Sequence, residues 1–197
     1  MNRKLIIVAG ILAGGKTTFS QKLSKELKIP CLNKDLIKTV LNKNIEISNR
    51  EDSIKLSITT TNIMWHIIEI CMQVCKPIII EANFNNTSEK QIKELLKKYN
   101  YESLTFLFVG DSKTLHKRFI ERDNSQERDN ANKINGLLND FSKWETSIKP
   151  LIDFNIGRKI IKIDTTEFSK VNFDDYIKEG FEFLYEKYDL KKTEHST

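Results

Sequence analysis

The residues with the clearest chemical meaning are Gly10-Ile11-Leu12-Ala13-Gly14-Gly15-Lys16-Thr17. Glycine at positions 10 and 15 permits backbone angles and a close approach that a Cβ atom would block. Successive N–H groups of such a loop point at phosphate groups, and the Lys16 ammonium is a point charge for the β- and γ-phosphates. The Thr17 hydroxyl is a ligand for Mg²⁺. The pattern therefore predicts a binding site for a nucleoside triphosphate, ATP with Mg²⁺.

The segments on either side of this loop support the same prediction. Leu5-Ile6-Ile7-Val8-Ala9 is apolar on both faces, as expected of a fully buried strand. From Lys16 to Leu27, apolar residues recur with the period of a helix. A strand before the loop and a helix after it are the setting in which this pattern binds phosphates. We predict that the nucleotide contacts Gly10, Ala13, Gly14, Gly15, Lys16, Thr17 and Thr18.

Apolar runs alternate with amphipathic segments along the rest of the chain, which indicates a parallel sheet covered by helices. Strands are predicted at residues 5–9, 30–32, 77–81, 104–109 and 159–163. Helices are predicted at residues 16–27, 34–41, 54–75, 112–122, 137–149 and 173–188, with one more beginning at residue 88. We therefore predict a three-layer α/β fold with a five-stranded, mostly parallel sheet and helices on both faces. The chain shows no linker, so residues 1–190 are expected to form one domain, followed by a frayed tail at 191–197.

The composition narrows the class of partner. The net charge of +5 and the pI near 9.0 suit phosphorylated ligands, but much of the excess is lysine spread over helix faces. Nucleic acid is therefore possible as a partner but not indicated. No apolar run approaches the roughly 20 residues of a membrane span. The apolar start of the chain runs into the phosphate loop instead of a cleavage site, and the cysteine count is odd, so we expect a cytoplasmic protein without a disulfide framework. The oligomeric state stays open.

Four shorter motifs follow the phosphate loop. They are Lys-Asp-x-x-Lys at 34–38, Glu-Ala-Asn-Phe at 81–84, Arg-x-x-x-Arg at 118–122 and Ile-Asp-Thr-Thr at 163–166. In this order and at these separations, the chain resembles the small P-loop kinases and kinase-like ATP-binding proteins related to the polynucleotide kinase, chloramphenicol phosphotransferase and zeta-toxin families. The resemblance runs from Lys4 to about Tyr176. It implies a phosphotransferase with a lid segment, here at roughly 122–135.

The resemblance gives Asp35 and Lys38 a role at the acceptor. Asp35 lies just past a short strand, where relatives place an aspartate that faces the acceptor hydroxyl and serves as its general base. The alternative is that Asp35 caps the helix that begins at Leu36. Lys38 occupies a position that is often arginine in related kinases, so it is expected either to bind an anionic substrate or to be a surface lysine.

Glu81 and Asn83 follow the apolar strand that ends at Ile80. A carboxylate at this place is expected to hold Mg²⁺ through water, together with Thr17, although a charge after a buried strand also occurs simply because the strand ends there. Asn83 is predicted to support the substrate in the same loop.

Arg118 and Arg122 stand on one face of a predicted helix, and the polar stretch after it contains Arg128. The resemblance implies that Arg118 packs against adenine and that Arg122 and Arg128 clamp the charge of the transferring phosphate when the lid closes, Arg122 as a catalytic residue and Arg128 as a substrate-binding one. The alternative is a salt-bridged surface helix. Thr165 follows the last strand, where relatives wrap the adenine with loop backbone. Relatives often carry a His-Pro-Gly-His-like stretch after the lid arginine, whereas residues 128–132 contain neither histidine nor proline.

The expected function is transfer of the ATP γ-phosphoryl group to a hydroxyl of a small-molecule or nucleotide acceptor. Lys16, Asp35 and Arg122 are the predicted catalytic residues. A GTPase is disfavoured, because Asn33-Lys34-Asp35 does not match the guanine motif and Glu81-Ala82-Asn83-Phe84 lacks the required glycine. The remaining alternative is an ATP-binding regulatory module without transfer activity, which the altered stretch after Arg122 favours. The acceptor itself stays open.

Overall fold

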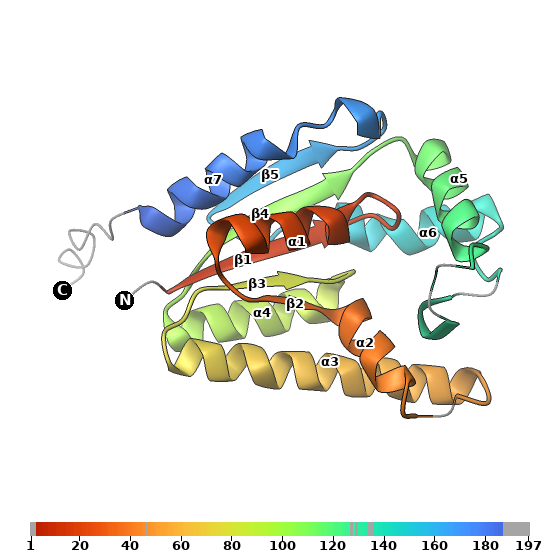
Figure 1. The fold of residues 1–197 in the computed structure, drawn as a ribbon, viewed down its shortest axis with the longest axis horizontal. Coiled ribbons are helices and arrows are strands. Elements are labelled where there is room, and N and C mark those ends of the chain that lie inside the picture. Colours follow the sequence, from red (N-terminus) through yellow and green to blue (C-terminus); the bar gives the residue numbers. More distant parts are fainter. Residues whose placement is uncertain (1–2, 46, 127, 129, 134–135, 187–197) are drawn as a thin grey trace.

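The computed structural model describes residues 3–45, 47–126, 128, 130–133 and 136–186. At its centre is a five-stranded sheet in the order β2-β3-β1-β4-β5 (Figure 1). The strands are β1 (Lys4–Gly10), β2 (Cys31–Asn33), β3 (Ile78–Glu81), β4 (Glu102–Val109) and β5 (Lys159–Asp164). All four strand pairings are parallel, so the predicted sheet is confirmed and is parallel throughout. Residues 191–197, predicted to be a frayed tail, lie outside the described residues, as do the last residues of the predicted final helix.

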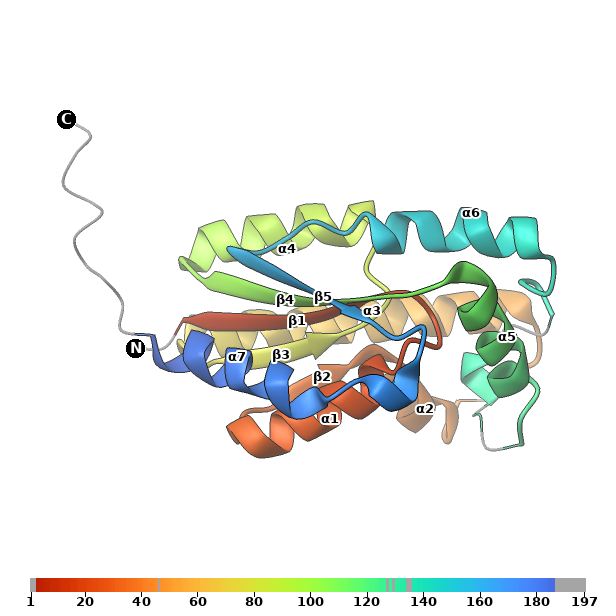
Figure 2. The same ribbon diagram turned by 90° about the horizontal axis from the view of Figure 1, so that it is seen from above.

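Nine helical segments connect and follow these strands within the described residues. The α-helices are α1 (Lys16–Leu27), α2 (Lys34–Asn42), α3 (Arg50–Gln73), α4 (Asn86–Tyr99), α5 (Ser112–Asp123), α6 (Phe141–Ile152) and α7 (Phe173–Tyr185). Two short 3₁₀-helices are η1 (Asn130–Asn132) and η2 (Phe168–Lys170). Figure 2 shows helices above and below the sheet, which confirms the three-layer architecture.

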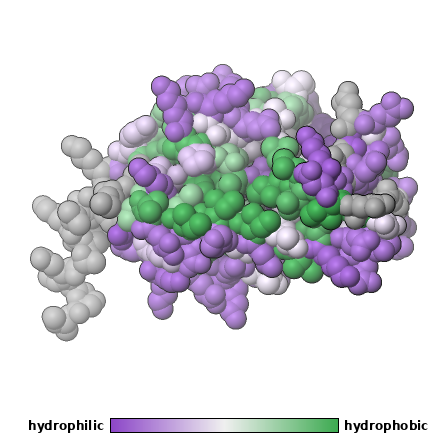
Figure 3. Space-filling model, turned by 60° about the horizontal axis from the view of Figure 1, so that its bottom comes forward, coloured by the Kyte–Doolittle hydropathy of each residue, from purple (hydrophilic) through white to green (hydrophobic). Residues whose placement is uncertain are grey.

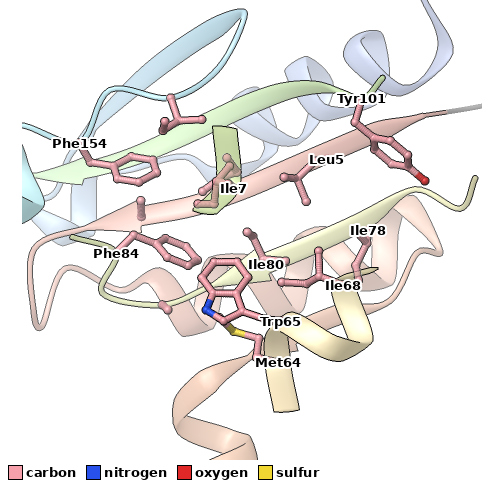
Figure 4. Packing of buried hydrophobic residues seen from close by; sticks show 14 of the residues in the cluster. Leu5, Ile7, Met64, Trp65, Ile68, Ile78, Ile80, Phe84, Tyr101 and Phe154 are labelled. Carbon is pink, nitrogen blue, oxygen red and sulfur yellow. The ribbon is translucent and has the colours of Figure 1, made fainter. Parts of the chain in front are cut away.

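The alternation of side chains along β1 explains the two helical layers. Leu5 and Ile7 point to the face covered by α3 and α4, and Ile6 and Val8 point to the face covered by α1 and α7. Every residue of β1 is buried, as expected of a central parallel strand. On the first face, Ile7 lies among the side chains of Trp65, Ile80 and Phe84 in a buried apolar core (Figure 4).

The parallel register brings the carboxyl ends of the strands to one edge of the sheet. Val8 of β1 is level with Glu81 at the end of β3 and with Phe106 of β4, and Asn33 of β2 is also level with Glu81. The phosphate loop and the chain after β2, β3 and β5 therefore open on the same side. Ligands of open parallel sheets bind at this edge.

The structure corrects the ends of some predicted elements. Helix α6 begins at Phe141 rather than at residue 137, because the Asp140 side chain accepts a hydrogen bond from the Lys143 N–H and caps the helix there. Helix α3 begins at Arg50 rather than at residue 54, because the Asn49 side chain caps it in the same way. Both caps are polar residues that hydrophobic periodicity does not detect.

The surface carries some apolar side chains as well. Figure 3, which brings the α3 side of the molecule forward, shows apolar side chains gathered in a band. Helix α3 contributes the exposed Ile54, Ile58 and Ile70, and the exposed Val74 directly follows it. Its apolar content therefore exceeds what its packing on the sheet buries. Even so, no helix in the described part of the chain is long and apolar enough to cross a membrane.

Candidate active site

The phosphate loop is held against the sheet by its first glycine. Gly10 has a φ of 114°, and a Cβ atom there would lie 2.1 Å from the Phe108 carbonyl oxygen of β4. The next residue, Ile11, donates its N–H to the same oxygen at 3.0 Å. Gly15 at the other end has a φ of 87°, and Ala13 between them has a φ of 58°. The loop thus needs glycine at position 10, because any side chain there would collide with β4.

Lys16 begins helix α1 and turns its ammonium back into the loop. Its Nζ donates to the carbonyl oxygens of Gly10 at 3.0 Å and Ile11 at 2.7 Å. The residue is only 7% exposed, and burial lowers its pKa to about 8 although Glu81 opposes this shift. An anionic ligand in the loop would favour the protonated, positively charged form of Lys16. Lys16 is therefore placed as the cation of an anion site.

Glu81 is the buried carboxylate that faces this lysine. It is 5% exposed, and burial raises its pKa to about 7, an effect partly opposed by Lys16. Its Oε2 accepts a hydrogen bond from the Thr17 hydroxyl at 3.1 Å. The two residues predicted to hold the metal are thus in direct contact.

Asn33 completes this group, and sequence reasoning missed it. Its Nδ2 donates to Glu81 Oε2 and lies 3.5 Å from Thr17 Oγ1. Its Oδ1 accepts from the Leu36 N–H at 2.9 Å and caps α2. One signal in the sequence could have identified Asn33: it is an asparagine, a common helix-capping residue, and it stands directly after the predicted strand at residues 30–32 and before a predicted helix. Because Asn33 is the cap, the alternative role of Asp35 as the helix cap is wrong.

The donors around Glu81 fit Mg²⁺. The Thr17 hydroxyl and the Glu81 carboxylate are hard oxygen ligands on one side of the loop, and Mg²⁺ binds one or two such groups together with water and substrate phosphates. A buried carboxylate whose pKa is raised by burial lacks a full counter-charge, which a divalent cation would provide.

A cavity of about 380 Å³ opens above the loop. It brings together ten of the predicted site residues, and Leu12 is the one lining residue that was not predicted. Its lining consists of Leu12, Ala13, Gly15, Lys16, Thr17, Thr18, Asp35, Glu81, Asn83, Arg118 and Arg122. Asp35 lies in the first turn of α2 and is exposed to the cavity, as is Asn83 after β3. The residues predicted to bind the phosphates and those predicted to bind the acceptor therefore line one cavity.

Arg118 joins α5 to the loop after β5. Its Nη1 donates to the Thr165 carbonyl oxygen at 2.5 Å and its Nη2 to the Thr166 carbonyl oxygen at 2.7 Å. Thr165 itself is buried, and its hydroxyl donates to the Val109 carbonyl oxygen at 3.2 Å. The planar guanidinium is thereby fixed beside the phosphate loop, and its Thr165 partner contributes backbone rather than side chain.

Arg122 lies one turn further along α5, at the cavity. The residue as a whole is exposed, yet lost hydration around the guanidinium, and then repulsion from Arg128, lower its pKa. Asp35 and Glu81 both act on it with the opposite sign. Arg122 thus lines the shared cavity, and no ion pair to it is found within the part of the chain that the structure describes.

Two predicted substrate residues lie outside the cavity lining. Lys38 is buried on α2, with its Nζ 3.5 Å from the Ser53 hydroxyl of α3. Arg128 forms an ion pair with Asp123 at 3.2 Å. The lid segment is described only in part, because residues 127, 129, 134 and 135 lie outside the described residues.

Comparison with known proteins agrees with this geometry. A family model described as AAA domain matches residues 5–142, a range that includes the phosphate loop, Asp35, Glu81, Arg118 and Arg122. No curated protein matches the chain.

Solved structures resemble the chain over nearly its whole length. A protein from Chloroflexus aurantiacus, provisionally assigned as a kinase, is 23% identical and covers 93% of this chain and 100% of its own, with a TM-score of 0.82. Shikimate kinase from Acinetobacter baumannii, solved with shikimate, is 14% identical and covers 92% of each chain, with a TM-score of 0.60. The Mycobacterium tuberculosis APS kinase, solved with AMPPNP and APS, is 11% identical and covers 93% and 98%, with a TM-score of 0.56.

At these identities the structural matches establish the fold, which is the α/β fold of the small P-loop kinases. The match to the family model spans well over half of the chain and contains the phosphate loop. The chain therefore belongs to the AAA domain family and has a P-loop kinase-like fold.

Proposed function

We propose that this protein transfers the γ-phosphoryl group of Mg²⁺-ATP to a hydroxyl group of a small-molecule or nucleotide acceptor. One observation carries the proposal: Lys16 and Thr17 of the phosphate loop share a single cavity with the exposed carboxylate of Asp35 and the guanidinium of Arg122. A protein that only binds a nucleotide needs Lys16 and Thr17 for the phosphates, but it has no use for Asp35 and Arg122 at the same cavity. A carboxylate and a further cation beyond the γ-phosphate position are what transfer to a hydroxyl requires.

The nucleotide half of the site suits ATP. The loop N–H groups and the positive end of α1 would bind the phosphates, with Lys16 between the β- and γ-phosphates. Arg118 offers the face of its guanidinium to a base, held in place by the carbonyl oxygens after β5. Thr17 and Glu81 would hold Mg²⁺, which would neutralise charge on the phosphate oxygens when bound.

The acceptor half of the site suits activation of a hydroxyl. The Asp35 carboxylate would accept the proton as the acceptor oxygen bonds to the γ-phosphorus and the bond to the leaving ADP breaks. Lys16 and Arg122 would stabilise the charge on the transferring group. Asn83, which lines the same cavity, would donate to or accept from the acceptor. Support for a small acceptor comes from the two related kinases solved with shikimate and with APS.

The test is ADP release from ATP and Mg²⁺ against a panel of sugars, nucleosides, antibiotics and polynucleotide 5′-hydroxyls. Wild type is compared with Lys16→Ala, Asp35→Asn and, as a matched control, Asp153→Asn, which makes the same change on an exposed side chain at the end of α6. We expect turnover with one acceptor class, lost in the first two variants and kept in the control.

The opposite result has a defined meaning. If ATP binds but no acceptor stimulates ADP release, and Asp35→Asn behaves like wild type, the protein is an ATP-binding regulatory module and Asp35 is not its base. The altered stretch at residues 128–132 is the sequence feature that favours this second reading.

A further inference from the structure

The segment after α5 returns to the helix that carries Asp35. Asn132, at the end of η1, donates its Nδ2 to the Thr39 hydroxyl at 2.9 Å and to the Asp35 carbonyl oxygen at 3.2 Å. Thr39 and Asp35 stand one turn apart on the same face of α2, so one amide bridges both. Residues separated by more than ninety positions in the chain are thereby joined.

The other side of Asn132 is tied to α5. Its backbone carbonyl oxygen accepts from Arg128 Nε at 3.0 Å and Nη2 at 2.5 Å. The same Arg128 Nε lies 3.2 Å from Asp123 Oδ1, and both side chains are largely buried, at 12% and 5% exposure. Asp123 is the last residue of α5 and directly follows Arg122. An ion pair shielded from water in this way is screened by salt much less than a surface pair.

These contacts form a continuous connection, which we call the latch: Thr39, Asn132, Arg128 and Asp123. It begins on α2 beside Asp35 and ends on α5 beside Arg122. Asp35 and Arg122, which lie beside its two ends, line the same cavity from different elements, and they are the base and the cation of the function proposed above. The latch is therefore a structural link between the two halves of that site.

We propose that Asn132 is a positioning residue that fixes α2 to α5 through the latch and so sets the placement of Asp35 relative to Arg122. This inference rests on the proposed function for its catalytic consequence but not for the contacts themselves. Asn132 does not itself line the cavity, and its hydrogen bond to Asp35 is made to the backbone carbonyl oxygen, which leaves the carboxylate free to face the cavity. Asn132 acts indirectly, by holding Asp35 and Arg122 in place relative to each other. This placement matters for the rate, since a displacement of about 1 Å between reacting groups costs up to about a hundredfold.

The predicted kinetic effect is specific. Loss of the latch leaves the phosphate loop and Arg118 in place, so the affinity for ATP stays unchanged. The turnover number for phosphoryl transfer falls by about tenfold to a hundredfold, since the proton acceptor and the cation are no longer held together. Water then competes better with the acceptor hydroxyl, and the amount of ADP released per acceptor phosphorylated rises.

The experiment compares matched variants of the full chain. Thr39→Val removes the hydroxyl that accepts from Asn132 at nearly constant shape, and Thr39→Ser keeps it. Asn132→Ala removes the amide, and Asn130→Ala makes the same change at an exposed position of the same 3₁₀-helix. For each variant we would measure ATP affinity, turnover, the ratio of ADP to phosphorylated acceptor, and hydrogen exchange of residues 34–42 and 122–133 without ligands.

We expect Asn132→Ala and Thr39→Val to speed hydrogen exchange of residues 34–42 and 122–133 by about tenfold. This factor corresponds to the net free energy of one or two hydrogen bonds. Both variants should lower turnover at constant ATP affinity, whereas Thr39→Ser and Asn130→Ala should match wild type. Wild-type exchange or wild-type turnover in Asn132→Ala would overturn the proposal. If wild type shows no acceptor-dependent turnover, the proposed function fails, and unchanged exchange in Asn132→Ala would then overturn the latch separately.

Discussion

Glu81 makes the stability of the nucleotide-free protein depend on pH in a predictable direction. Burial raises its pKa from 4.5 to about 7 in the folded state. The folded protein therefore binds a proton that the unfolded chain has already released between about pH 4.5 and pH 7. The free energy of unfolding consequently falls as pH rises through this window. Above pH 7 the Glu81 carboxylate is ionised in the folded protein, and the full loss of stability from burying its charge is present. Glu81→Gln removes the titration while keeping the shape of the side chain.

The size of the effect follows from the shift. A change of one pKa unit corresponds to about 1.36 kcal/mol, so a rise from 4.5 to about 7 corresponds to up to about 3 kcal/mol. We expect Glu81→Gln and wild type to differ little at pH 5. At pH 7.5 the variant should be the more stable by up to about 3 kcal/mol, a figure that already includes the opposing effect of the Lys16 charge on Glu81.

The assay is urea unfolding at pH 5.0, 6.0, 7.0 and 7.5 in EDTA, which removes divalent cations. The exposed Glu94→Gln serves as the control, because it makes the same substitution on α4 away from the cavity. The reasoning is refuted if the unfolding free energies of wild type and Glu81→Gln run parallel across this pH range. It is also refuted if Glu94→Gln changes the slope as much as Glu81→Gln does.

Four further variants test other contacts. Gly10→Ala would place a Cβ atom 2.1 Å from the Phe108 oxygen at a φ of 114°, and should lower the unfolding free energy in urea by more than about 3 kcal/mol. Gly14→Ala should lower the unfolding free energy less, because a Cβ atom there would come no nearer than 3.2 Å to another atom, the Ile11 carbonyl oxygen. Arg118→Met removes two hydrogen bonds to the segment after β5, and should raise the KM for ATP about tenfold in steady-state kinetics with little change in kcat. Asn33→Ala removes the cap of α2 and the amide donor to the buried carboxylate, and should cost about 2 kcal/mol in urea unfolding.

Each of these predictions has a contrary result. Equal losses in the two glycine variants would contradict the role of the Phe108 oxygen in fixing the loop. An unchanged KM for ATP in Arg118→Met would remove Arg118 from the nucleotide site. Wild-type stability of Asn33→Ala would show that α2 does not depend on its cap.

The sequence predicted the residues whose role depends on local pattern. The phosphate loop could be identified because its glycines, Lys16 and Thr17 are consecutive and lie between a strand and a helix. The strands could be identified because burial on both faces leaves continuous apolar runs, as in β1 and β4. Asp35 and Glu81 were found because each lies near the end of a strand at the edge where parallel sheets bind ligands.

Other parts of the site depend on contacts between distant segments. Asn33 bonds to Glu81 because β2 and β3 are in register, and Asn132 meets Thr39 because the chain after α5 returns to α2. Neither relation has a periodic signal in the sequence. The placement of Lys38 against Ser53 depends in the same way on how α2 packs on α3.

The order of the strands has a consequence for synthesis of the chain. Strand β1 is made first, but its partners are β3, which begins at Ile78, and β4, which begins at Glu102. At roughly 5–20 residues per second, the ribosome needs roughly 5–20 s to reach the end of β4 after β1 has been made. Until β3 has been made, β1, every residue of which is buried in the folded protein, has neither partner strand, and until β4 has been made it lacks the second. We expect the nascent chain to depend on chaperones that cover exposed apolar segments until residue 109 has emerged.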